Sequence, residues 1–417
     1  MAMKRIGFVS TRIAGTDGVS LETFKWYQVL QKKGFECFFF AGELDTDPSH
    51  SLLEPKAHFE DPEILELHQA LFGIAKRSRA LSHRIHELAM HLKERLYEFC
   101  DEFSIELLIP ENALAIPMNI PLGIAITQLI AETSIPTIAH HHDFSWERKR
   151  FLINAVHDYL CYAFPPNLPS IRHVVINSAA SRQLSYRKGL TNTVIPNVFD
   201  FENPPPPENP KSKLLRQELG FNQDELFVLQ PTRVVPRKWI ERAVELVNLL
   251  AMKRPRLVVS HEAGDEGDLY AHRILEYAER LGVEVLYIGH MIGPCRCFTT
   301  NTDRPFTMED VYQAADLVTY PSGYEGFGNA FLEAVYFKRP LVVNRYSIFV
   351  EDIEPYGFDV VAFESFITRE VVAKLKRGLE PERLRPAVEK NYRLGTKYFS
   401  YNVLEQRLMH LIGSFME

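Results

Sequence analysis

The sequence lacks the features of several broad classes of protein. It has only five cysteines in 417 residues, and most of them lie in apolar runs, which does not fit the disulfide framework of a secreted domain. It contains no run of about 20 apolar residues that would cross a bilayer. Residues 1–10 run directly into a strand pattern, without the apolar region of a signal peptide. We therefore expect a cytoplasmic protein for which membrane association is not needed.

Clustered positive charge and metal-ligand spacing are also lacking. The net charge is −7 at pH 7 with the fifteen histidines counted as neutral, which argues against nucleic acid as a partner. Cys295-Arg-Cys297 has no second Cys or His pair at zinc-ligand spacing, so we expect two loop thiols, with a metal site as the alternative. His140 to His142 cannot all reach one ion, because neighbouring residues on a strand point to opposite faces. We therefore expect no protein-bound metal.

Three rival classes of enzyme lack their motifs. A dinucleotide-dependent oxidoreductase needs G-x-G-x-x-G after a strand, and Gly15 and Gly18 do not have that spacing. The strand-end Asp-x-Asp of a metal-dependent sugar transferase is not matched by Asp45-Thr-Asp47, because Pro48 follows it and indicates a loop. A hydrolase of the G-x-S-x-G type is not supported either, since that motif does not occur.

What the sequence does contain is an alternation of short apolar runs with longer amphipathic segments. This pattern is typical of parallel strands joined by helices that pack on both faces of a sheet. A length of 417 residues predicts two such domains. The expected strands are Arg5–Val9, Glu36–Phe40, Ile105–Ile109, Thr137–Ala139, Val174–Ile176 and Thr193–Ile195, then Leu226–Gln230, Arg256–Ser260, Glu284–Ile288, Leu317–Tyr320 and Leu341–Val343.

A proline-rich stretch, Asn203 to Pro210, separates the two sets of strands. Prolines there remove backbone donors and favour extended structure, so we expect a linker or a surface excursion between domains. A long helix is predicted at Lys76 to Cys100 and an amphipathic one at Asn402 to Phe415. The first helix carries several basic residues, so it could lie on a membrane surface. Its acidic residues dilute the positive charge and favour a helix packed on the sheet.

The segment Tyr320 to Ala334 carries the most information about chemistry. It reads Tyr-Pro-Ser-Gly-Tyr-Glu-Gly-Phe-Gly-Asn-Ala-Phe-Leu-Glu-Ala, and it joins an apolar strand to a helix. A glycine-rich turn at a helix start exposes backbone N–H groups beside the positive end of the helix dipole, which suits sugar hydroxyls or phosphate. Glycine-rich turns between a strand and a helix are also common where no ligand binds. This segment alone therefore leaves open whether the turn binds a ligand or has only a structural role.

Several motifs together resemble retaining glycosyltransferase family 4. Glu325 and Glu333 are similar to its E-x7-E motif, and Thr232-Arg-Val-Val-Pro-Arg-Lys238 is similar to its arginine-to-lysine turn, which binds the donor diphosphate. Val194-Ile-Pro-Asn197 resembles the Pro-Asn step before the family's interdomain linker. Ile135-Pro-Thr-Ile-Ala-His-His-His-Asp143 resembles its proline-strand-His-Asp loop, which makes His142 the active-site histidine.

The glycine loop of the family is matched less well. Gly15-Thr-Asp-Gly-Val-Ser20 follows the first expected strand, but Thr16 and Asp17 stand between the glycines where the family has an adjacent pair. The order of all these matches along nearly the whole chain is more specific than any one of them.

The resemblance implies the GT-B fold, an α/β architecture with two Rossmann-like domains facing across a cleft. It implies an N-terminal acceptor-binding domain at 1–200, a proline-rich linker at 201–213 and a nucleotide-sugar-binding domain at 214–395. A C-terminal helix at 396–417 would return to the first domain.

The resemblance also implies transfer with retention at the anomeric carbon, without a permanently bound cofactor. Arg233 and Lys238 would bind the diphosphate, Glu333 the ribose hydroxyls and Glu325 the hexose. The implied donor-binding set is Arg233, Lys238, Glu325, Gly326, Phe327, Gly328, Asn329 and Glu333, and the catalytic set is His142, Glu325, Arg233 and Lys238.

The donor and acceptor are predicted only as classes. We expect a GDP- or UDP-hexose, with glucose or mannose transferred to a small soluble acceptor such as a sugar or a sugar acid. The expected acceptor side comprises Gly15, Gly18, Asp143, Glu111 and Asn112, and Asn119 is a further polar candidate. A non-catalytic nucleotide-sugar or glycan-binding protein and a transferase for a lipid-linked acceptor are the alternatives.

Overall fold

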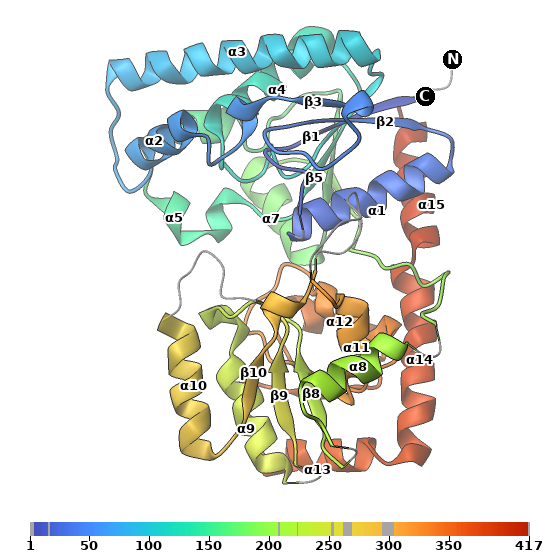
Figure 1. The fold of residues 1–417 in the computed structure, drawn as a ribbon. Helices are drawn as coiled ribbons and strands as arrows, with labels where there is room; N and C mark the ends of the chain where they lie inside the picture. The colour runs from blue at the N-terminus through green and yellow to red at the C-terminus, as the bar shows by residue number, and fades with distance from the viewer. Residues whose placement is uncertain are drawn as a thin grey trace. The chain divides into compact units, whose positions relative to one another are not determined.

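The computed structural model describes residues 4–15, 17–206, 209–222, 224–251, 254–261, 269–293 and 304–415. These residues form two compact units, whose elements are labelled in Figure 1. Unit 1 contains the described residues up to 196 together with 404–415, and unit 2 contains those from 197 to 403. Thr16, Cys295 and Cys297, which bear on the glycine loop and on the suggested thiol pair, lie outside the described residues.

Unit 1 is built on a seven-stranded parallel sheet with the strand order β3-β2-β1-β4-β5-β6-β7. The order reverses between β1 and β4, and open α/β sheets bind ligands at such a reversal, outside the carboxyl ends of the strands. The loops after β1, β4 and β5 are therefore where a ligand is expected. The strands are β1 Arg5–Val9, β2 Glu36–Ala41, β3 Ser51–Leu53, β4 Leu107–Pro110, β5 Thr137–His141, β6 Ile171–Val175 and β7 Asn192–Val194.

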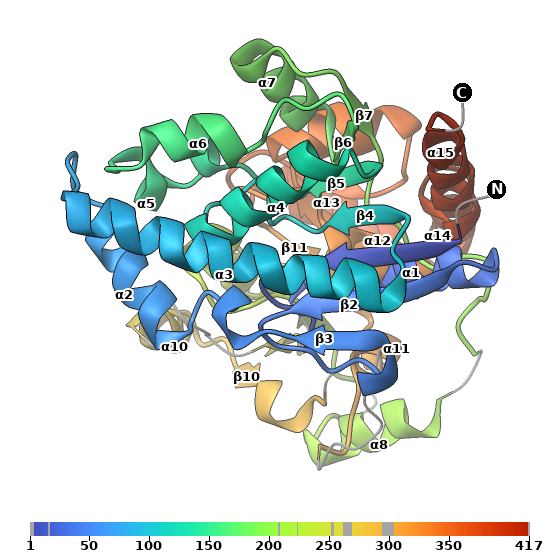
Figure 2. The same ribbon diagram turned by 90° about the horizontal axis from the view of Figure 1, so that it is seen from above.

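The core of unit 1 lies between this sheet and two neighbouring helices, α3 and α4. Leu92, Leu96 and Phe99 of α3 and Leu122 and Ile126 of α4 are buried together with side chains of the strands. The two helices run next to each other in Figure 2. The helices of unit 1 are α1 Gly18–Lys32, α2 Pro62–Leu71, α3 Arg79–Phe103, α4 Ile120–Thr133, α5 Lys149–Leu152, α6 His157–Ala163, α7 Ser178–Lys188 and most of α15 Tyr401–Gly413.

Two basic residues of α3 pair with acidic residues elsewhere in unit 1. Lys93 Nζ lies 2.8 Å from Glu132 Oε1, and Arg95 Nε lies 2.9 Å from Glu54 Oε2. This helix therefore packs on the sheet as the sequence predicts. Within the described ranges, no helix combines the length and apolarity that crossing a membrane would need.

Unit 2 repeats the architecture with a six-stranded parallel sheet in the order β10-β9-β8-β11-β12-β13. Its strand order reverses between β8 and β11. Its own core joins the strands to α9, α10 and α13. The strands are β8 Phe227–Gln230, β9 Arg256–Val259, β10 Val285–Tyr287, β11 Leu317–Tyr320, β12 Leu341–Asn344 and β13 Val361–Phe363, and the helices are α8 Pro210–Glu218, α9 Ile240–Leu250, α10 Leu269–Leu281, α11 Met308–Ala314, α12 Asn329–Tyr336, α13 Arg369–Gly378 and α14 Pro381–Phe399.

Some elements differ from the sequence-based expectation. The strands β3 and β13 were not expected, and each is only three residues long at the edge of its sheet. The helix α8 begins at Pro210, inside the stretch expected as a linker, because proline is favourable in the first helical turn, where its missing N–H has no intrahelical partner. The N-cap of α7 is Asn177, whose side chain accepts a hydrogen bond from Ala180 N at 2.7 Å.

Candidate active site

The predicted phosphate-binding turn follows β8 at the point where the sheet order of unit 2 reverses. Arg233 is exposed in the loop, whereas Lys238 ends a short 3₁₀ helix, Pro236–Lys238, and is only 8% exposed. Arg237, which the sequence analysis did not single out, precedes Lys238 in this 3₁₀ helix. The turn thus supplies three cations at the carboxyl end of a central strand.

Glu325 meets this turn from the neighbouring strand β11. Its Oε1 is bonded to Lys238 Nζ, and its Oε2 lies 3.4 Å from Arg237 Nη1. Burial pushes the pKa of Glu325 upward, but the charges of Lys238 and Arg237 outweigh burial and hold that pKa below its ordinary value. Glu325 is therefore an ionised carboxylate between two cations.

A further basic side chain near the turn was missed by sequence reasoning. His261 follows β9, and its Nδ1 is 2.9 Å from Ser260 Oγ. Burial and the nearby charges of Lys238 and Arg233 lower the pKa of His261 to about 4, so the imidazole is neutral at pH 7. Nothing in the sequence pattern distinguishes it, because only the pairing of β8 with β9 brings it to the turn.

The glycine turn before α12 is shaped by one residue in particular. Gly328, at the N-cap of α12, has φ +122°, and a Cβ placed there would come within 2.3 Å of Tyr346 Oη. Only glycine fits this position. Because Gly328 has no side chain, it cannot itself cap the N–H groups of the first turn of α12.

The other predicted residues of this turn differ in their placement. Phe327 is buried, with its ring centroid 5.6 Å from that of Phe399, so its side chain belongs to the core and only its backbone is left for a ligand. Gly326 is partly exposed. Asn329, the first residue of α12, accepts a hydrogen bond of 2.7 Å from Asn197 Nδ2. The Pro-Asn step of the sequence thus orients the start of α12.

Glu333 lies further along α12 and is partly exposed. Tyr312 of α11 donates a hydrogen bond of 2.6 Å from its Oη to Glu333 Oε2. Burial and the charge of Glu333 raise the pKa of Tyr312 well above its ordinary value, so the phenol keeps its proton. Tyr312 is a third residue that was not predicted from the sequence, because an aromatic residue in a short helix is usually a core residue.

The glycine loop of unit 1 is organised around Asp17. This residue caps α1 by accepting hydrogen bonds from Val19 N and Ser20 N, and it pairs with Arg12 at 3.3 Å. Gly15 has φ +70°, and its N–H donates to Asp45 Oδ2 at 2.9 Å. Gly18 is the first residue of α1. The departure from the family's glycine pair therefore has a local structural role, since it supplies an N-cap.

Three residues of the expected acceptor side come together with His142 at the ends of β4 and β5. Asn112 donates to Asp143 Oδ1 at 2.9 Å, and its Oδ1 accepts from the backbone N of His142 at 3.0 Å. His142 Nε2 lies 3.3 Å from Glu111 Oε2. Asp143 Oδ2 also accepts from Arg148 Nε at 2.6 Å. The structure thus fixes the backbone of His142 through Asn112 and its ring through Glu111.

Asn119 does not join this group. It caps α4 by accepting from Leu122 N at 3.0 Å, and its Nδ2 donates to the carbonyls of Lys56 and Ala57. Its buried side chain is occupied by these bonds, so the suggestion that it shapes an acceptor pocket is not supported.

Comparisons with known proteins identify the family of the chain. The family model described as "Glycosyl transferases group 1" matches residues 211–394. The mannosylglucosylglycerate synthase of Thermotoga maritima is 31% identical over 442 residues, which cover 97% of this chain and 98% of that protein.

Solved structures show the same architecture at low sequence identity. A glycosyltransferase from Rickettsia africae ESF-5 has a TM-score of 0.71 at 12% identity and covers 100% of both chains. Anabaena Alr3699/HepE in complex with UDP and glucose has a TM-score of 0.66 at 15% identity, covering 99% of this chain and 100% of that one. The fold is that of GT-B glycosyltransferases, and the chain belongs to the group 1 glycosyltransferases.

Proposed function

We propose that this enzyme transfers a hexose, glucose or mannose, from a GDP- or UDP-hexose to a hydroxyl of a small soluble sugar or sugar acid, with retention at the anomeric carbon. The name of the Thermotoga maritima relative favours mannose as the hexose and glucosylglycerate as the acceptor. The Anabaena complex contains UDP and glucose. Donors of both GDP and UDP must therefore be tested. The observation that carries the proposal is the group of cations beside the uncapped start of α12.

The difficult step of such a transfer is the departure of the nucleoside diphosphate. Charge develops on the leaving phosphate, and preorganised cations aimed at that charge lower the barrier most. Lys238 is held in place by Glu325, Arg233 is exposed nearby, and the N–H groups at the start of α12 add a further anion site. These groups supply the charge that a metal ion supplies in other transferases.

The remaining residues divide between donor and acceptor. In our proposal Glu333, oriented by Tyr312, accepts hydrogen bonds from the ribose hydroxyls, and Glu325 contacts the hexose. In unit 1, His142 borders the acceptor and the hexose, with Glu111, Asn112 and Asp143 around it. Gly15 and Gly18 complete the acceptor side.

The experiment is to incubate the full chain with each of GDP-mannose, UDP-mannose, GDP-glucose and UDP-glucose, with and without glucosylglycerate. We expect one donor to give nucleoside diphosphate and a new glycoside whose anomeric proton shows the configuration of the donor. An inverted product contradicts retention. Binding of a donor by calorimetry without nucleotide release favours the non-catalytic alternative. Transfer only to a lipid-linked acceptor in vesicles contradicts the small soluble acceptor.

A further inference from the structure

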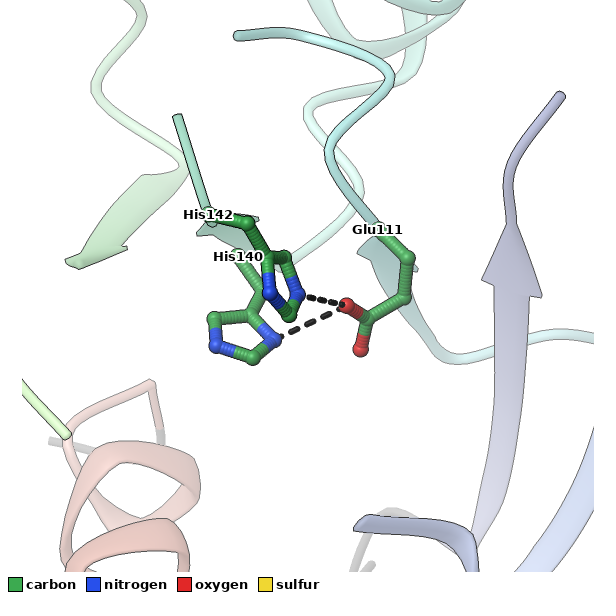
Figure 3. Close-up of side chains that lie close together, drawn as sticks. All are labelled: Glu111, His140 and His142. Atoms are coloured by element: carbon green, nitrogen blue, oxygen red, sulfur yellow. Dashed lines mark hydrogen bonds and ion pairs between the residues drawn. The ribbon is translucent and has the colours of Figure 1, made fainter. Parts of the chain in front are cut away.

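Three polar side chains of unit 1 converge on one point at the carboxyl ends of β4 and β5. Glu111 follows β4, His140 lies in β5, and His142 follows that strand directly. Both imidazoles point to the same carboxylate oxygen (Figure 3): Glu111 Oε2 is 2.8 Å from His140 Nδ1 and 3.3 Å from His142 Nε2. One nitrogen of each histidine and one oxygen of the glutamate lie within 4.8 Å of one another.

The fold itself imposes this convergence. His140 and His142 are two positions apart, so they point to one face of the sheet, whereas His141 points to the other face and lies 2.9 Å from His173. The parallel bridge between Glu111 and His140 places the carboxylate on the neighbouring strand at the same level. Three consecutive histidines therefore cannot share an ion, but two of them and a glutamate can.

Hydrogen bonding within the group leaves polar atoms unsatisfied. Glu111 is fully buried, and both of its contacts to histidine use Oε2. In the part of the chain that the structure describes, its Oε1 and the Nε2 of His140 have no partner. Few buried polar atoms in native structures lack a partner, so the free Oε1 of this carboxylate is open to a further ligand, whereas Nε2 of His140 is turned away from Glu111 and takes no part in the group.

An acidic residue and an aromatic ring adjoin the group. Glu22, which pairs with Lys25 at 2.8 Å, acts electrostatically on both Glu111 and His140. The ring of Trp26 stacks on His140 at 4.1 Å between centroids, which fixes the orientation of that imidazole.

We propose that Glu111, His140 and His142 form a binding site for one divalent cation of the zinc type. Metal–ligand distances of about 2.0–2.2 Å place adjacent ligand atoms of a tetrahedral ion about 3.3 Å apart, close to the contacts of 2.8 and 3.3 Å. Two imidazoles and one carboxylate favour Zn²⁺ or Co²⁺ over Mg²⁺ or Ca²⁺, which prefer oxygen ligands only. Three protein ligands leave a fourth position open.

This site is distinct from the diphosphate-binding turn, which belongs to unit 2 and carries its own cations. The inference goes beyond the proposed transfer. It shares Glu111 and His142 with the acceptor side of that proposal, but its test measures metal binding and not turnover. A failed metal test leaves the assignment of Arg233 and Lys238 unchanged, and a failed transfer assay leaves the metal site unchanged.

The test is a titration of the chelator-treated full chain with Co²⁺ alone, followed by Zn²⁺. We expect one Co²⁺ per chain, with the visible bands of a four- or five-coordinate ion and without the charge-transfer band of a sulfur ligand. Zn²⁺ should abolish these bands and raise the melting temperature. Glu111→Gln and His142→Gln should each weaken Co²⁺ binding by at least about 100-fold, with circular dichroism confirming that the variants fold.

Two pairs that contain thiols could compete for Co²⁺, and the control removes both. His157 Nε2 and Cys161 Sγ lie 3.5 Å apart on α6, and Cys295 and Cys297 form the thiol pair noted in the sequence. The variant His157→Gln/Cys161→Ser/Cys295→Ser/Cys297→Ser should bind Co²⁺ like the wild type. Loss of binding in this variant, a sulfur charge-transfer band in the wild type, or no stoichiometric binding by the wild type would overturn the proposal. If the Glu111 and His142 variants do not fold, the stoichiometry and the ligand type read from the wild-type Co²⁺ spectrum test the proposal.

Discussion

At the scale of single residues, the pair of Lys238 and Glu325 links stability to catalysis. Both side chains are less than 10% exposed, so removal of one leaves the charge of the other buried. Lys238→Met should lower turnover by at least about 100-fold, since loss of one charge contact to the transition state costs about 2.7–4 kcal/mol. It should also destabilise the fold by up to about 3 kcal/mol.

The double variant Lys238→Met/Glu325→Gln separates these two effects. We expect it to recover most of the free energy of unfolding, measured by urea titration, because no unpaired charge stays buried. Turnover should not recover. Near-normal nucleotide release by Lys238→Met would contradict the phosphate assignment.

The two glutamates of the motif should differ in what they bind. In the proposed role of Glu333, the change Glu333→Gln weakens a charge-assisted contact to ribose that contributes about 1.5–3 kcal/mol. The affinity for the nucleoside diphosphate should then fall roughly 10- to 150-fold. Glu325→Gln should instead change turnover or the choice of hexose. Calorimetric titration with the nucleoside diphosphate alone measures the difference, and an equal loss in both variants would show that the division of roles is wrong.

Tyr312 provides an independent check on Glu333. Tyr312→Phe removes only the hydroxyl that orients Glu333, so it should weaken diphosphate binding in the same direction but less than Glu333→Gln. The matched control is Tyr277→Phe, which deletes a similar hydrogen bond of 3.1 Å to Glu245 on α9. It should leave the affinity unchanged.

The sequence predicts the charged residues of the site better than their partners. Lys238 and Glu325 are recognisable because their motifs follow central strands. Tyr312 and His261 are not, because each reaches the site only through the packing of another element. Glu111 was predicted as an acceptor residue, but its position opposite His140 depends on the register between β4 and β5.

At the scale of elements, the start of α12 depends on Gly328. Gly328→Ala combines an unfavourable φ with a Cβ that would come within 2.3 Å of Tyr346 Oη, so the first turn of α12 must shift. We expect a loss of about 1–3 kcal/mol in stability and a loss of diphosphate affinity, measured by thermal unfolding and calorimetry.

The control for Gly328 is Gly378→Ala in α13. A Cβ there meets nothing within 4 Å, and the glycine is helical, so alanine should be neutral or slightly stabilising. If Gly328→Ala behaves like Gly378→Ala, the turn does not require glycine.

Some strands could be predicted from the sequence and others could not. Long central strands such as β1 and β11 have the predicted bounds, because buried parallel strands are continuous apolar runs between turns. The edge strands β3 and β13 are three residues long and were not expected, although the edge strands β7 and β10 are equally short and were. Only pairing with β2 and β12 defines β3 and β13.

At the scale of the whole molecule, each unit has its own core. The buried clusters around α3 and α9 contain residues of one unit only. A nucleoside diphosphate at 100 times its Kd should therefore stabilise unit 2 by about 2.7 kcal/mol. Hydrogen exchange should slow at residues 227–240 and 317–336, whereas β1 and β4 of unit 1 should be unaffected. Equal protection in both units would contradict a donor site confined to unit 2.

Residues 404–415 belong to unit 1 although unit 2 precedes them in the chain. In this segment Leu404 and Leu408 are fully buried, and Arg407 donates to the carbonyl of Val194. Residues 404–415 are translated after all of unit 2, so unit 1 lacks its last helix until the whole of unit 2 has been synthesised. The domain that is translated first is thus completed last, and a nascent chain stalled shortly after residue 403 should expose the unit 1 surface that α15 covers.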